Sequence, residues 1–191
     1  MHSFSLNFYS LLRRGIIRST EALLVARSKT GDQPAFEELV HRHKDAVLNL
    51  ARRIVLDTDA AQDVTQEVFI SAFCQLQQFR GEASFATWLY RITVNQARAY
   101  LRSERRRQAR WEKQRQSVSP LVQPRDDDSP VMALLCELPE KQRVAIALFH
   151  LQELSLADIA RVMGVPQGTV KAWLSRGRER LRVLAAERGV R

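Results

Sequence analysis

A stretch of aromatic and basic residues in the middle of the chain has the composition of a surface for single-stranded nucleic acid. Five aromatic residues lie between Phe79 and Tyr100, and residues 98–115 contain seven Arg and one Lys against two Glu. Aromatic rings stack on unpaired bases, at roughly 1–3 kcal/mol each, and a basic strip binds the phosphates. The alternative is that residues such as Phe85 and Trp88 pack a core along one face of an amphipathic helix. That alternative leaves the arginines unexplained, because they have no core to enter.

The short loop inside this stretch is expected to form a pocket between two helices. Gly81 is expected to end one helix, and Ser84 can cap the next. The loop over residues 80–83 would then present backbone N–H groups between Phe79 and Phe85. We expect such a pocket to accept a base that has left the stack.

The rest of the composition predicts an all-α protein with a polyanionic partner. The 191 residues include only 7 Gly and 6 Pro, and segments rich in Val, Ile and Thr between turn residues are missing from the sequence. A net charge of +9 favours binding to DNA, RNA or anionic lipid. The apolar residues at the N-terminus precede an Arg pair, the reverse of a signal peptide, and are too few to span a bilayer. A cytoplasmic protein without membrane insertion is therefore expected.

The sequence contains no motif that predicts an enzyme or a bound cofactor. A Gly-rich phosphate loop, a nucleophile motif and a cluster of metal ligands are all missing from it. Cys74 and Cys136 lie in different halves of the chain, in neither a disulfide framework nor a CxxC motif. His41 and His43 have no cysteine nearby, so we expect them on a solvated helix surface.

Three helices are predicted before this loop. The first covers Ser19–Arg27, the second follows an N-cap at Asp32 with Pro34 in its first turn, and the third runs from about Ala60 to Phe79. The third helix has one apolar stripe, which we expect to be buried: Ala61, Val64, Val68, Ala72 and Leu76.

The outer face of the third helix is acidic. Residues 57–70 contain four acids and no base, in a chain of strongly positive net charge. The positive end of the helix dipole explains Asp59, but Glu67 lies too deep in the helix for that. The acidic face therefore predicts a second partner, either basic or a protein.

Two domains are expected, separated by a flexible linker. Residues 117–130 contain three prolines, several serines and a run of three Asp, a composition typical of linkers. We place a first domain at residues 19–107, the linker at residues 108–130 and a second domain at residues 131–191. Residues 1–18 are expected to form a flexible extension.

The second domain has the spacing of a helix-turn-helix. A helix is expected to open at Pro139, another to cover Leu156–Met163 and end at Gly164, and a third to begin at Gln167. Counting from Leu156, a small residue, a glycine and apolar residues occupy the positions where two crossing helices require them: Ala160, Gly164, Val170 and Trp173. The last helix and the residues after it contain six Arg and one Lys against two Glu, as a helix in the major groove requires.

Taken together, the two halves resemble a bacterial RNA polymerase sigma factor of the extracytoplasmic-function (ECF) type, in the sigma-70 family. The resemblance covers about residues 23–184. Its matching segments are Asp63–Phe69, Phe79–Gly81, Phe85–Asn95, Leu138–Glu140 and Gly168–Arg178.

The resemblance implies three sites. The residues for docking on the clamp coiled coil of core RNA polymerase would be Asp63, Gln66, Glu67 and Phe69. The residues for recognising and melting the −10 promoter element would be Phe79, Arg80, Gly81, Ser84, Phe85, Trp88, Tyr90, Arg91, Asn95 and Arg98. The residues for reading the duplex −35 element would be Thr169, Lys171, Ala172, Trp173, Ser175, Arg176 and Arg178.

The expected protein is therefore a sigma factor for transcription initiation, of a type associated with stress responses. It would be a monomer when free, and an anti-sigma factor is a further candidate partner. The alternative is a helix-turn-helix regulator whose first half is a dimerisation or sensing domain. Gel filtration with and without core polymerase distinguishes the two, because a sigma factor comigrates with core.

Overall fold

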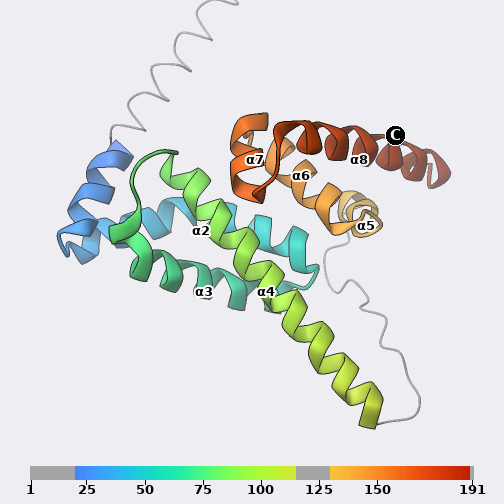
Figure 1. The fold of residues 1–191 in the computed structure, drawn as a ribbon, viewed down its shortest axis with the longest axis horizontal. Helices are drawn as coiled ribbons and strands as arrows, with labels where there is room; N and C mark the ends of the chain where they lie inside the picture. Colours follow the sequence, from blue (N-terminus) through green and yellow to red (C-terminus); the bar gives the residue numbers. More distant parts are fainter. Residues whose placement is uncertain (1–19, 115–129, 190–191) are drawn as a thin grey trace, which may run out of the picture.

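The part of the chain that the computed structural model describes, residues 20–114 and 130–189, is entirely helical (Figure 1). A helix over residues 20–29 comes first. The named elements are α2 (Gln33–Val55), α3 (Thr58–Gln75), the 3₁₀ turn η1 (Leu76–Gln78), α4 (Phe85–Gln114), α5 (Pro130–Cys136), α6 (Glu140–His150), α7 (Leu156–Met163) and α8 (Gln167–Glu187). The expected all-α fold is confirmed. The expected extension, residues 1–18, and residues 115–129 of the expected linker lie outside the described residues.

Capping residues fix where the helices of the first half begin. The Asp32 carboxylate accepts a hydrogen bond from the backbone N–H of Ala35 at 3.1 Å, with Pro34 in the first turn of α2. Asp57 does the same for Ala60 at 2.7 Å and so begins α3. Each carboxylate satisfies a backbone donor that has no partner inside its helix.

The predicted stripe of the third helix is buried. It lies where α3 packs against α2 and α4 and continues into η1, and its members are Ala61, Val64, Val68, Ala72 and Leu76. Both histidines of α2 were expected on a solvated surface. This is confirmed for His41, which is exposed, and wrong for His43, which is half-buried. The Nε2 atom of His43 lies 2.7 Å from a carboxylate oxygen of Glu21, so this pair joins α2 to the preceding helix.

Helix α4 is longer than its apolar pattern indicates. The pattern fades after Arg107, yet the helix continues to Gln114 and its last turns extend away from the bundle (Figure 1). Residues 102–110 are mostly Arg, Gln, Glu and Ala, which favour helix on intrinsic propensity without a buried face. An ion pair between Arg107 and Glu104, at 2.7 Å, adds local support.

The helix-turn-helix has the predicted boundaries. Ser155 caps α7 by accepting a hydrogen bond from the N–H of Asp158, and Gly164 ends that helix in the left-handed region at φ 67°. Ala160 and Val170 are buried where the two helices meet. Helix α5 was not predicted, because it begins at the edge of the segment rich in Pro, Ser and Asp.

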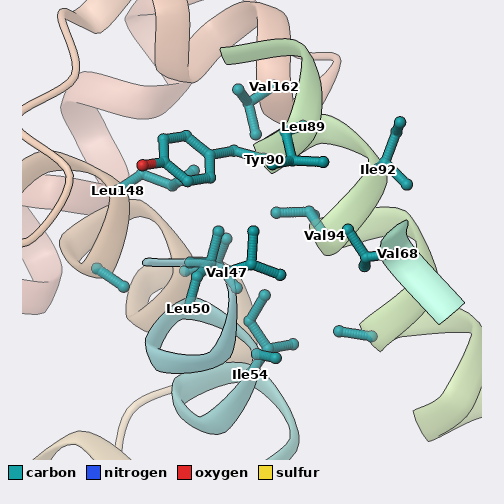
Figure 2. Close-up of a cluster of buried hydrophobic side chains, with 14 of the residues drawn as sticks. Val47, Leu50, Ile54, Val68, Leu89, Tyr90, Ile92, Val94, Leu148 and Val162 are labelled. Carbon is teal, nitrogen blue, oxygen red and sulfur yellow. The ribbon is translucent and has the colours of Figure 1, made fainter. Parts of the chain in front are cut away.

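The two halves share one buried core. Helix α6 contacts α2, and α7 contacts α4. Figure 2 shows Leu148 of α6 and Val162 of α7 in the same cluster as Leu89 and Tyr90 of α4. We call this packing of residues 130–189 on α2 and α4 the closed arrangement. The closed arrangement was not expected from the sequence, which indicates two domains joined by a flexible linker.

Candidate nucleic-acid interface

The exposed face of α3 combines acidic and apolar side chains. Asp63, Gln66 and Glu67 are exposed as expected, whereas Phe69 is half-buried against the core. Ile70 and Phe73 extend the same face and are 57% and 53% exposed. Sequence reasoning missed these two, although they lie three and six residues beyond Glu67, on neighbouring turns of the helix.

Neither Asp63 nor Glu67 has an ion-pair partner within the described part of the chain. Two unpaired carboxylates beside two large exposed apolar side chains form a surface suited to a protein partner with basic and apolar groups.

Three aromatic rings meet at the start of α4. The ring centroids of Phe79 and Trp88 are 5.2 Å apart, and Phe85 lies 5.9 Å from Phe79 and 5.5 Å from Trp88. Phe85 is only 3% exposed, so protein atoms cover its faces. Phe79 and Trp88 are half-buried. Phe85 therefore belongs to the core, whereas Phe79 and Trp88 remain partly accessible.

The loop between η1 and α4 is fixed at both ends. Ser84 accepts a hydrogen bond from the N–H of Thr87 at 3.1 Å, which confirms it as the cap of α4. At the other end Lys29 donates to the carbonyl oxygen of Phe79 at 2.5 Å, and its ammonium lies 5.9 Å from the centroid of that ring. Gly81 makes the turn at φ 74°, where a side chain would be strained.

A cavity of about 180 Å³ lies at this loop, as the sequence indicated. Its walls are residues 78–83 together with Thr87, Trp88 and Arg91 of α4. Arg161 and Val162 of α7 complete the lining, and sequence reasoning did not anticipate them. The cavity thus has an aromatic side, backbone groups, two arginines of the first half (Arg80 and Arg91) and one of the second (Arg161).

The remaining residues expected at the −10 element divide into two groups. Arg80, Arg91 and Asn95 are exposed. Tyr90 and Arg98 instead contact the second half of the chain: the Tyr90 hydroxyl donates to Gln152 at 2.6 Å, and Arg98 donates to Glu140 at 3.0 Å. Burial, with a smaller contribution from the charge of Glu21, raises the pKa of Tyr90 to about 12.

The basic strip continues along the outer part of α4. Its exposed members are Arg102, Arg105, Arg106, Arg107 and Arg110. They stand beyond the aromatic rings on the same helix, so the predicted order of aromatic residues followed by basic ones is preserved in space.

Helix α8 presents a polar face to solvent. Its exposed members among the expected −35 residues are Lys171, Ala172, Ser175, Arg176 and Arg178. Thr169 and Trp173 are half-buried. The Arg178 guanidinium lies 4.9 Å from the centroid of Phe149, and its Nε atom lies 3.3 Å from His150, so this side chain also packs on α6.

Two glycines of α8 differ in their surroundings. A side chain at Gly177 would place its Cβ 2.6 Å from the Cδ1 atom of Ile146, so α6 and α8 cross closely there. Gly168, in the first turn, has nothing within 4 Å of such a Cβ. Together with the buried Val170 and Leu174, this crossing fixes which face of α8 remains exposed.

Metal and membrane features are missing from the described helices. Within residues 20–114 and 130–189, no group of three or more His, Cys, Asp or Glu is placed to hold a metal ion. No helix in the same ranges is both long and apolar enough to cross a bilayer.

Comparisons with known families match both halves. Residues 39–107 match the sigma-70 region 2 model, and residues 129–181 match a sigma-70 region 4 model. The chain is 38% identical over 175 residues to the ECF RNA polymerase sigma-E factor of Haemophilus influenzae, covering 84% of this chain and 92% of that protein. It is 37% identical over 171 residues to the RNA polymerase sigma-H factor of Pseudomonas aeruginosa, covering 82% of this chain and 89% of that protein.

A solved structure extends the likeness to three dimensions. CnrH, solved in complex with the cytosolic domain of CnrY, matches with a TM-score of 0.68 at 27% identity, over 88% of this chain and 98% of CnrH. Sigma factors are not enzymes, in agreement with the prediction from the sequence. The chain belongs to the ECF sigma factors of the sigma-70 family, which direct RNA polymerase to specific promoters for transcription initiation.

Proposed function

We propose that α3 docks this sigma factor on the clamp coiled coil of core RNA polymerase. Asp63, Gln66 and Glu67 would contact basic groups there, and Ile70 and Phe73 would supply the apolar contact. Phe69, half-buried, would anchor the helix at the edge of the contact. The support is the unpaired acidic charge beside exposed apolar area on one helix face.

The loop at the start of α4 would capture an unpaired base of the −10 element. The observation that favours this most is the cavity at the loop, which has the half-buried Trp88 on one side and loop backbone on the other. Duplex bases are already stacked on each other, so such a cavity gains little from closed DNA and more from an extruded base. Arg80 and Arg91 would bind the adjoining phosphates, and Asn95, exposed on the next turns of α4, would contact the strand further along.

Helix α8 would read the −35 element in the major groove. Ala172, Ser175 and Arg176 lie on its exposed face, with Lys171 beside them, as a recognition helix requires. Thr169 and Trp173 would contact the DNA backbone from the edge of that face. Arg178 would act from its place on Phe149, where the ring holds the guanidinium.

The two functional domains would be residues 19–107 and 131–191, with residues 108–130 between them and residues 1–18 preceding them. The free protein would be a cytoplasmic monomer. CnrH was solved together with CnrY, and a sigma factor of similar fold, RpoE, was solved in complex with the anti-sigma factor NepR from Bartonella quintana. An anti-sigma factor is accordingly proposed as a partner here.

One experiment tests these assignments together. Core polymerase and the full chain are mixed with fragmented genomic DNA, and the transcript starts are sequenced. The proposal expects starts that share two upstream elements, at −35 and −10. Replacing Ser175 and Arg176 with Ala should change the preference at −35 only. A changed −10 preference in that variant would contradict the assignment of α8.

A further inference from the structure

We propose that Lys29 is a positioning residue for the capture of the −10 base. It lies in the helix over residues 20–29, which we call the first helix and which precedes the residues matched to region 2, 39–107. Its role rests on the proposed function of the loop at the start of α4. Lys29 would act on DNA through Phe79, by holding the ring and the backbone at the edge of the cavity of about 180 Å³.

Lys29 contacts Phe79 at two points. Its Nζ atom donates a hydrogen bond to the carbonyl oxygen of Phe79 at 2.5 Å, and it lies 5.9 Å from the centroid of the ring. The hydrogen bond fixes the backbone where η1 ends. The second contact holds the ring, because a cation within about 6 Å of an aromatic ring is attracted to its face. One ammonium group therefore holds both the main chain and the side chain of Phe79.

A second hydrogen bond joins the same two segments in the opposite direction. The Nε2 atom of Gln77, in η1, donates to the carbonyl oxygen of Lys29 at 2.6 Å. The last carbonyl groups of a helix have no N–H partner inside the helix, so Gln77 supplies one at the end of the first helix. The two bonds together hold the end of the first helix against the start of the loop.

The first helix is itself firmly attached to the bundle. Val25 is 7% exposed and belongs to the core, and the Glu21 carboxylate lies 2.7 Å from the Nε2 atom of His43 on α2. The His43 ring in turn lies 5.5 Å from the ring of Phe85. Figure 1 shows the first helix, in blue, beside the loop that leads into α4. An anchored helix of this kind can fix the position of the loop that it contacts.

The loop depends on how its two ends are held. Residues 79–83 line the cavity of about 180 Å³ beside α4 and also a wider hollow, of about 660 Å³, beside the first helix. A Cβ atom added at Gly81 would have no atom within 4 Å. The middle of the loop is therefore open on both sides. Ser84 holds one end as the cap of α4, and Lys29 holds the other through Phe79.

Phe79 transmits the effect of Lys29 to the cavity. The ring centroids of Phe79 and Trp88 lie 5.2 Å apart, and both residues line the cavity. A binding site holds its ligand only when its side chains are kept close to the productive geometry by their neighbours. Without the ammonium group, Phe79 is free to turn, and the aromatic side of the cavity loses its fixed shape. Lys29 would thus favour base capture without touching the base.

The experiment uses holoenzyme assembled from core polymerase and the full chain, on a promoter taken from the sequenced transcript starts. The lag before steady abortive synthesis, measured at a series of holoenzyme concentrations, separates the affinity for closed DNA from the rate constant of opening. The test variant is Lys29→Met, which keeps the aliphatic stem and removes the ammonium group. The matched control is Lys44→Met, the same change at an exposed position of α2.

A series of templates then shows whether Lys29 acts through the captured base. Each template has one abasic nucleotide in the non-template strand of the −10 element. An abasic nucleotide keeps its phosphate and lacks its base, so it removes base capture and leaves any phosphate contact in place. Lys29→Arg tests for rescue, because a guanidinium group can donate to the same carbonyl oxygen and lie on the same ring.

We expect Lys29→Met to open the intact promoter about tenfold more slowly than the wild type, which corresponds to about 1.4 kcal/mol in the barrier. Its affinity for closed DNA and its comigration with core should stay unchanged. The difference from wild type should disappear on the one template that lacks the captured base and persist on the others. Lys44→Met and Lys29→Arg should open close to the wild-type rate. Gln77→Ala should show a smaller loss with the same dependence on template, without any change of charge.

Two results would overturn the role of Lys29. One is an opening rate in Lys29→Met equal to that of Lys44→Met. The other is an equal deficit of Lys29→Met on every template, which a direct phosphate contact or a general loss of folded protein would give. Failure of the proposed function is visible in the wild type alone, because no abasic position would then slow opening.

Discussion

Replacement of Arg143 should destabilise the protein far more than replacement of a surface arginine. Its guanidinium donates three hydrogen bonds, to the carbonyl oxygens of Arg53, Ile54 and Leu138, at 2.7, 3.1 and 3.0 Å. Burial lowers the pKa of Arg143, so the charged form is held in place by these carbonyls against a desolvation cost. In Arg143→Ala the carbonyls lose their donors and stay buried.

The magnitude follows from the partners left behind. Each buried carbonyl without a donor costs about 1–3 kcal/mol, and Arg143→Ala affects three of them, with a partial offset because the desolvation cost of the guanidinium disappears as well. We therefore expect Arg143→Ala to lower the free energy of unfolding by about 3–5 kcal/mol. Arg143→Lys should lower the free energy of unfolding by less, because the lysine ammonium can still donate to some of these carbonyl oxygens.

Urea denaturation followed by circular dichroism measures these losses. The control is Arg182→Ala, on the exposed side of α8, where the guanidinium pairs with Glu179 at 2.8 Å. Exposed pairs of this kind contribute about 0–1 kcal/mol. The reasoning is refuted if Arg143→Ala costs no more than Arg182→Ala.

Three further predictions follow from single features of the structure. Charge reversal at Asp63 and Glu67 should abolish comigration with core polymerase in gel filtration and leave the circular dichroism spectrum unchanged, because both side chains are exposed. Gly177→Ala should lower the free energy of unfolding by about 1–3 kcal/mol, because the added methyl group overpacks the contact with α6. Gly168→Ala, which has open space around it, should change the free energy of unfolding by less than about 1 kcal/mol. Equal losses for the two variants in thermal melts would contradict this. Because burial raises the pKa of Tyr90 to about 12 from 10.0, its contribution to stability is complete below about pH 10 and declines as the pH rises to about 12. The wild-type protein should therefore lose about 2–3 kcal/mol between these pH values that Tyr90→Phe does not lose. Urea denaturation at a series of pH values measures this difference. If the free energy of unfolding depends on pH equally in both proteins, Tyr90 is not the group responsible.

Local signals in the sequence were enough to place most helices. Asp32 and Ser84 each accept the backbone N–H predicted for a cap, and Gly164 takes the left-handed turn. Such signals depend on residues three or four positions apart, which a single sequence displays directly. The helix-turn-helix was predictable for the same reason, because its small and apolar positions follow a fixed spacing.

Contacts between distant parts of the chain were not predictable in this way. Arg143 bonds to residues about ninety positions away, and no local pattern marks a buried arginine. Tyr90 is similar: its place among aromatic residues suggests a base contact, but its partner Gln152 comes from the other half. Ile70 and Phe73 lacked a signal of their own, since an apolar residue on a helix is more often buried than exposed.

The most direct test of the proposed site is promoter opening, followed by permanganate reactivity of unpaired thymines. Ser84 is a poor target, because its hydroxyl caps α4 and its loss would disturb the helix itself. Arg91 and Asn95 are exposed, so replacing both with Ala alters the surface and not the core. A matched control replaces Arg42 and Asn49, which are the same residue types at exposed positions of α2, outside the proposed DNA-binding surfaces.

We expect wild-type protein with core polymerase to give reactive thymines at the −10 element. The Arg91→Ala, Asn95→Ala variant should still bind core and form the closed complex, with greatly reduced thymine reactivity, and the control should stay close to wild type. Full reactivity in the Arg91→Ala, Asn95→Ala variant would contradict the account, because the unpaired strand would then be held elsewhere.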